Sequence, residues 1–213
     1  MSTRILISAC ILLAVIAPTP AIARDKEAEH EYRELVDKLR HGDTSVDYDQ
    51  LRFAYARTKA YQPYGGHEKV DEMNEAFQSR DWKKVAKLAD AILDDRYVDG
   101  DAHATAMIAH GELGNEMQSK FHRAVAQGLL HSICPPERGD SPRAPCKVIS
   151  VSEEYFFLRS VGLESESQST RPCGNDGERI CDVLHVKPKD GDAFDLYFDA
   201  SLPMEWMAKE LGE

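Results

Sequence analysis

The sequence predicts an α+β protein that is mainly helical. Over residues 26–133, apolar residues recur at helical spacing, and short turns separate the runs. After residue 134 the apolar runs become short and alternate with polar residues, and four of the five cysteines lie there. We therefore expect antiparallel helical hairpins over 24–133 and a small antiparallel sheet with one helix over 134–213, either as two units or as one continuous domain.

The first 23 residues have the pattern of a secretory signal peptide. Arg4 supplies the positive charge, residues 5–16 form an apolar core, and residues 21–23 (Ala-Ile-Ala) offer a small-residue cleavage site. Cys10 resembles a lipoprotein cysteine, but most of the apolar run follows it instead of preceding it. No later stretch is long enough to span a bilayer. We expect cleavage after Ala23 and a periplasmic or secreted chain.

Six helices are predicted in the helical half. Gly42 ends the first helix, and the second has the clearest start, because Asp47 can cap it and Gln50 stands three residues later. The apolar stripes of the six helices are Tyr32, Leu35, Val36 and Leu39; Leu51 with its neighbours; Val70, Met73 and Phe77; Trp82, Val85, Ala89 and Ile92; residues 102–113; and Met117, Phe121, Val125 and Leu129.

The helix over 102–113 carries a candidate metal face. His103, Met107 and His110 share one side of this helix, and a soft metal such as copper could use them. These three residues also occupy positions that hold Trp, Gly and Tyr in tetratricopeptide repeats, whose period is near the 35-residue spacing of Trp82 and Met117. We favour packing in a helical-repeat-like (TPR-like) array and expect no metal and no other cofactor.

The C-terminal part is predicted to hold short strands around one helix. Ser152 can cap a helix that Gly162 ends, and residues 148–151 before it form a strand candidate. A polar loop is expected over 164–178. Two strands, 180–187 and 193–199, are then joined by a hairpin turn.

The four cysteines after the predicted cleavage site indicate two disulfides in an exported chain. Cys134 and Cys146 bracket a proline-rich loop, whereas Cys173 and Cys181 flank the turn at 174–177. These nearest-neighbour pairs are the favoured connectivity. A zinc site made by all four is the alternative, although no close C-x2-C pair is present.

The charge balance is acidic. The formal net charge is −11, and removal of the predicted signal peptide, which has one basic and no acidic residue, makes it −12. A charge of this sign repels phosphate backbones and anionic lipids, so nucleic acid and the bare membrane surface are poor partners, and we expect no nucleic-acid binding.

A stripe of tyrosines around one arginine is the most distinctive candidate site. Tyr48, Arg52 and Tyr55 share a helical face, and Tyr61 and Tyr64 follow at once. Tyrosine and arginine are typical of recognition surfaces, but the same stripe is expected if Arg52 is buried in a structural corner where it bonds a carboxylate or backbone carbonyls. The second interpretation is favoured.

The same stripe carries a family resemblance. The run from Asp47 to Tyr55 (D-Y-x-x-L-R-x-x-Y), the Y-x-P-Y-G at 61–65, and the segments 147–155, 182–184 and 196–199 resemble a bacterial family catalogued as domain of unknown function 4919. The resemblance implies an exported bacterial protein and brings no activity or catalytic residues. The four cysteines and the proline-rich loop depart from the family pattern.

No catalytic motif is present: the sequence lacks a nucleophile elbow, a phosphate-binding loop and a dinucleotide fingerprint. We expect a non-enzymatic binding or scaffold protein of the cell envelope, whose partner is another envelope protein or a peptide. A small exported hydrolase with unidentified catalytic groups and a metal-binding periplasmic protein are the alternatives.

Overall fold

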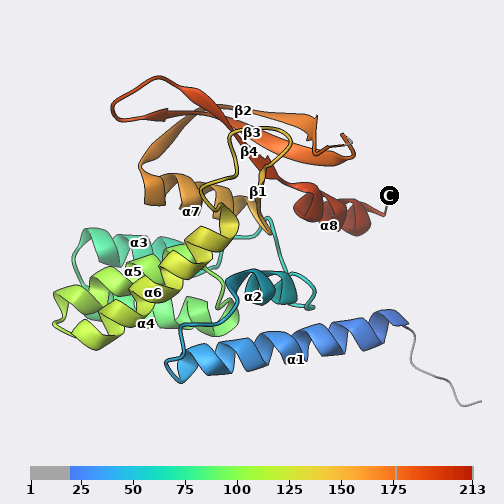
Figure 1. Cartoon of the computed structure of the whole chain (residues 1–213). Coiled ribbons are helices and arrows are strands. Elements are labelled where there is room, and N and C mark those ends of the chain that lie inside the picture. Colours follow the sequence, from blue (N-terminus) through green and yellow to red (C-terminus); the bar gives the residue numbers. More distant parts are fainter. Residues whose placement is uncertain (1–19, 176, 213) are drawn as a thin grey trace, which may run out of the picture.

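The computed structural model describes residues 20–175 and 177–212, and their side chains from residue 26 onward. These residues form eight helices and a four-stranded sheet (Figure 1). The sheet lies on one side of the molecule, helices α1 to α6 lie on the other, and α7 lies between them (Figure 1). The protein is therefore α+β and mainly helical, as the sequence predicts. The predicted signal peptide lies mostly outside the described residues, and its predicted cleavage site falls in the first turn of α1.

The helical part follows the predicted order closely. Its helices are α1 (Pro20–Arg40), α2 (Tyr48–Tyr55), α3 (Val70–Gln78), α4 (Trp82–Asp95), α5 (Gly100–Glu112) and α6 (Glu116–Ile133). Helices α2, α4 and α5 each begin after an aspartate whose carboxylate accepts a hydrogen bond from the backbone N–H three residues later. These caps satisfy amide groups that have no partner within the helix. Asp47 is one of them. However, the side chain of Gln50 donates to Glu31 and does not complete a capping box.

The C-terminal part differs from the prediction in three ways. The expected polar loop over 164–178 is largely a strand, β2 (Leu163–Cys173), and a last helix, α8 (Ser201–Leu211), was not predicted. The strand expected at 148–151 is instead the two-residue β1 (Cys146–Lys147). Almost every residue of β2 is exposed or half-buried, so β2 lacks the apolar alternation by which strands are detected.

The remaining elements are α7 (Val151–Val161), β3 (Arg179–Pro188) and β4 (Phe194–Asp199). The sheet order is β1-β4-β3-β2, in which β1 runs parallel to β4 and the other pairs are antiparallel. The sheet is thus mixed, and the fully antiparallel arrangement that we expected is wrong for β1. Gly162 ends α7 with a left-handed φ of 72°, as predicted.

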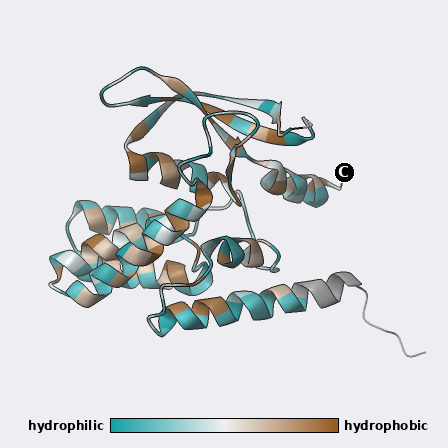
Figure 2. Ribbon diagram, in the orientation of Figure 1, coloured by the Kyte–Doolittle hydropathy of each residue, from teal (hydrophilic) through white to brown (hydrophobic). Residues whose placement is uncertain are grey.

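One apolar cluster joins the helices to the sheet. It contains Leu51 and Ile92 from the helical part and Leu184 and Phe198 from the strands, and all of these are buried. In Figure 2 each helix of α3 to α6 shows both hydrophobic and hydrophilic residues, as burial of one side requires. No described helix combines the length and the hydropathy that crossing a bilayer requires.

Both predicted disulfides are present. Cys134 pairs with Cys146 and connects the end of α6 to β1, and Cys173 pairs with Cys181 across the β2–β3 turn. The cysteines are therefore paired with one another, and the zinc alternative is wrong.

Helix α5 and helix α7 approach each other closely at Gly100. A Cβ atom added to Gly100 would lie 2.5 Å from the ring of Phe156, which is buried. Gly111, near the other end of α5, differs because its added Cβ would meet only Ser119 Oγ at 3.5 Å, an ordinary contact. The contact between Gly100 and Phe156 holds α7 against the start of α5.

We predict that Gly100→Ala lowers the free energy of unfolding by about 1–3 kcal/mol, because the buried ring must shift. The melting temperature should then fall by roughly 2–4 °C for each kcal/mol of stability lost, as expected for a chain of this size. Gly111→Ala is the matched control, and its helix propensity should stabilise the protein by up to about 1 kcal/mol. Equal melting temperatures for the two variants would contradict the close approach.

Candidate functional site

Arg52 on α2 is completely buried and forms an ion pair with Glu153 on α7. Its Nε donates to Glu153 Oε1 at 2.8 Å and its Nη2 donates to Oε2 at 2.6 Å. Two parallel bonds of this kind fix both the distance and the relative orientation of the groups. Among the described residues, Arg52 is the largest side chain with no exposed surface.

The pair is extended by bonds to the backbone between β1 and α7. Arg52 Nη2 donates to the carbonyl oxygen of Lys147 at 2.6 Å, and Ile149 N donates to Glu153 Oε2 at 2.8 Å. Tyr61 then donates its hydroxyl to the Ile149 carbonyl at 2.5 Å. The connection between β1 and α7 is therefore tied to the helical part by charged groups and by a hydroxyl. The geometry is that of the structural corner that the sequence analysis favours.

The five predicted recognition residues do not form one exposed surface. Tyr55 and Tyr61 are buried like Arg52, and Tyr55 donates to the carbonyl oxygen of Ala60. Tyr48 is half-buried and donates to the Thr44 carbonyl. Tyr64 is different, because 41% of its surface is exposed. A buried side chain is not available to a separate partner, so only Tyr64 contributes to the groove described next.

A groove of about 710 Å³ lies between helices α3, α5 and α7 and the loop that follows Tyr61. Its lining includes Tyr64, Ile108 and Tyr155, three of the eight large hydrophobic side chains that are exposed in the described part of the chain. Met73 and Phe77 of α3 complete the apolar wall. Exposed apolar residues scattered singly over a surface are ordinary, whereas their concentration in one hollow indicates a binding site.

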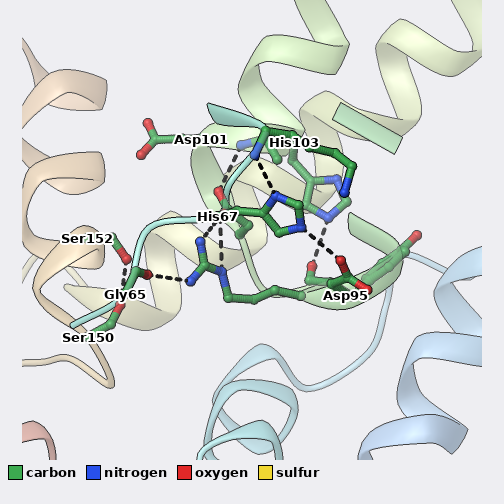
Figure 3. A network of polar contacts seen from close by, with 12 residues as sticks. Gly65, His67, Asp95, Asp101, His103, Ser150 and Ser152 are labelled. Carbon is green, nitrogen blue, oxygen red and sulfur yellow. Dashed lines mark hydrogen bonds and ion pairs between the residues drawn. The ribbon is translucent and has the colours of Figure 1, made fainter. Parts of the chain in front are cut away.

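The loop that forms one wall of the groove is held in place by Arg96. This residue donates from Nη1 to the carbonyl oxygen of Gly65 at 3.0 Å, while its Nη2 pairs with Asp99 at 2.7 Å (Figure 3). His67 adds a second tie, since its Nε2 lies 2.8 Å from a carboxylate oxygen of Asp95 (Figure 3). The loop is therefore anchored at two points to the α4–α5 connection.

Charged and neutral polar groups also line the groove. Asp101 at the start of α5 forms an ion pair with Arg159 on α7, with Nε 3.3 Å from Oδ1. Burial raises the pKa of Asp101, and the nearby guanidinium of Arg159 opposes this rise. Asn74 and Thr105 line the groove without a side-chain hydrogen bond to any described residue. Their amide and hydroxyl groups are available to a ligand.

The chain is matched along almost its whole length by one family, Domain of unknown function (DUF4919), over residues 20–209. It belongs to this family. No curated protein and no solved structure matches the chain. The family resemblance seen in the tyrosine and arginine stripe is thereby confirmed, whereas the tetratricopeptide resemblance is not.

Two buried carboxyl groups of this DUF4919 member, Glu154 and Asp182, interact electrostatically and are not part of the groove lining. Glu154 on α7 has no exposed surface, and neither of its carboxyl oxygens has a hydrogen-bond partner within the described residues. Asp182 on β3 is also buried and accepts a hydrogen bond from Thr170 at 3.1 Å. Burial, followed by the charges of Asp182 and Glu153, raises the pKa of Glu154 to about 9. Glu154 is therefore protonated at neutral pH.

A cluster of three histidines and one aspartate occupies the other side of α5. His103 is buried, and its ring contacts the rings of Tyr97 and His122, so it packs in the core as the sequence analysis favours. However, His110 and His122 each place a ligating nitrogen within 4.8 Å of a carboxylate oxygen of Asp90 and of one another. The sequence analysis missed Asp90 and His122, because they lie on α4 and α6 and only the helix packing brings them to α5.

We predict that Glu153→Ala lowers the free energy of unfolding by about 3–5 kcal/mol, because Arg52 is left buried and without its ion-pair partner. Urea denaturation of the whole chain measures this loss. Arg57→Ala removes an exposed ion pair with Glu31 and is the matched control, for which less than about 1 kcal/mol is expected. A Glu153 variant as stable as the Arg57 variant would contradict the structural role of the buried pair.

The raised pKa of Glu154 predicts a specific pH dependence. Between the ordinary glutamate pKa and about 9, the unfolded state loses a proton that the folded state keeps, so this group makes the folded state less stable as pH rises. Glu154→Gln should therefore become more stable relative to the wild type by up to about 1.4 kcal/mol for each pH unit from 5 to 9. Denaturation curves at several pH values test this. Glu164 is exposed, so for the control Glu164→Gln the free energy of unfolding should change with pH as it does for the wild type. The same pH dependence for Glu154→Gln and the wild type would refute the raised pKa of Glu154.

Proposed function

We propose that this chain is a non-catalytic binding protein of the bacterial cell envelope. In this proposal the groove between α3, α5 and α7 binds a short, largely apolar peptide segment of another envelope protein. The single observation that carries the proposal is the gathering of Tyr64, Ile108 and Tyr155 in one hollow.

The size and chemistry of the groove support a peptide ligand. Its volume of about 710 Å³ lies within the range that encloses small ligands or several side chains. A peptide also brings backbone N–H and C=O groups that must be hydrogen-bonded when they leave water. Asn74 and Thr105 line the groove walls and can bond such groups. The two exposed tyrosines supply contact area at little cost in side-chain entropy.

The state of the charged groups favours binding over hydrolysis. Asp99 and Asp101 line the groove, but each already forms an ion pair with an arginine. The unusual carboxyl groups of Glu154 and Asp182 are not part of its lining. A hydrolase needs an acid or base that reaches the substrate. Here the carboxylates of the lining are held in ion pairs and the other two lie outside it, so these groups favour a structural role over catalysis.

The location in the envelope rests on two observations. The N-terminal sequence has the pattern of a signal peptide, two disulfides are present, and disulfides persist in oxidising compartments outside the cytoplasm. The acidic charge of the chain disfavours nucleic acid as an alternative partner.

The test is selection of peptides from a random displayed library on the immobilised full chain. Wild type should enrich peptides with aromatic and aliphatic side chains, and Ile108→Asp should bind the selected peptides at least 10-fold more weakly, because a charge is then placed against apolar ligand atoms. Met117→Asp is the matched control, since Met117 is 80% exposed and lies outside the groove. Failure to select any peptide, or equal weakening by both variants, would overturn the proposal.

A further inference from the structure

Three neighbouring helices bring together a set of nitrogen and oxygen ligands that are not part of the groove lining. Asp90 comes from α4, His110 from α5 and His122 from α6, and one ligating atom of each lies within 4.8 Å of the other two. The rings of His110 and His122 are stacked, with centroids 5.5 Å apart and planes inclined by 7°. We propose that Asp90, His110 and His122 form a binding site for a divalent transition metal ion such as Zn²⁺.

The buried His103 orients His122 for this role. Tyr97 has a carbonyl oxygen 2.9 Å from His103 Nε2, and because a carbonyl only accepts, Nε2 carries the proton. His103 Nδ1 is then the acceptor for His122 Nδ1, which lies 3.0 Å away. His122 therefore carries its proton on Nδ1 and leaves the lone pair of Nε2 available. Metal-binding histidines are held in the same way by an outer partner that accepts from their second nitrogen.

The distances require only a small local closure around the ion. In a tetrahedral zinc site with bonds of about 2.1 Å, ligand atoms are about 3.4 Å apart. Asp90 is exposed and His110 is half-buried, so both side chains can move toward the fixed ring of His122. Three protein ligands leave the fourth position of the metal for water or another small ligand.

The surroundings are open to solvent and favour a cation. Asp90 and His122 line a surface hollow of about 380 Å³ that Arg40 and Asp94 also line. Arg40 forms an ion pair with Asp94 at 2.8 Å, so its charge is balanced and the charge of Asp90 remains. Two imidazoles and one carboxylate suit zinc, copper or nickel, whereas calcium and magnesium prefer oxygen ligands alone.

The test is calorimetric titration with Zn²⁺ of a chain that begins at Arg24, the predicted mature N-terminus, carries no histidine tag and has been stripped of metal by a chelator. The wild type should bind one Zn²⁺ per chain. Asp90→Asn and His110→Ala should each weaken binding at least 10-fold, and replacement of Zn²⁺ by Co²⁺ should give a visible absorption band that both variants lose. His131→Ala is the matched control, because His131 is an exposed histidine of α6 outside the cluster, and it should bind as the wild type does.

Two outcomes would overturn the inference: a wild-type chain that does not bind Zn²⁺, or ligand variants that bind it as tightly as His131→Ala. Circular dichroism and thermal melting of Asp90→Asn and His110→Ala show whether each variant is folded when it is titrated. Ile108→Asp, which tests the groove, should keep Zn²⁺ binding. The metal site and the peptide groove can thus fail or succeed separately.

Discussion

The buried pair of Arg52 and Glu153 is the interaction on which the arrangement of this molecule depends. It joins α2, near the start of the helical part, to α7, which lies beneath the sheet. Charged groups that leave water are tolerated only when each hydrogen bond is made, and here the backbone at Lys147 and Ile149 completes the set. The geometry of a bidentate pair is narrow, so α7 is held in a defined position relative to the helices.

Helix α7 then serves three purposes at once. Its Glu153 holds the helix to α2, its Tyr155 and Arg159 form a wall of the groove, and Glu154 is buried toward Asp182 of the sheet. The two neighbouring glutamates show how strongly environment decides chemistry. Glu153 forms an ion pair with the guanidinium of Arg52. Glu154 is buried near the negative charges of Asp182 and Glu153, which raise its pKa, so it keeps its proton. A groove built on a helix fixed in this way is largely formed without a ligand, which would lower the cost of the binding that we propose.

Local signals in the sequence predicted much of the fold. The helices of the first part follow from apolar periodicity, and Asp47 and Gly42 mark their ends because caps act within a few residues. Both disulfides follow from loops that bring their cysteines together at short range. Strand β2 was missed, because its pairing with β3 is a tertiary contact and its polar residues face solvent. The candidate site was predicted only in part: of the tyrosine and arginine stripe, Tyr64 alone lies in the groove.

The sequence by itself indicated the family, the order of the helices and the favoured cysteine pairs, since each rests on short motifs or on spacings along the chain. Only the tertiary structure decided which polar residues are buried and which of them come into contact with one another. Arg52 and Glu153 are 101 residues apart, and the sequence around either residue does not indicate its ion-pair partner. The same holds for Asp90, His110 and His122, which three separate helices bring to one point. Periodicity predicts the buried face of a helix, whereas the partner on that face depends on how the helices pack together.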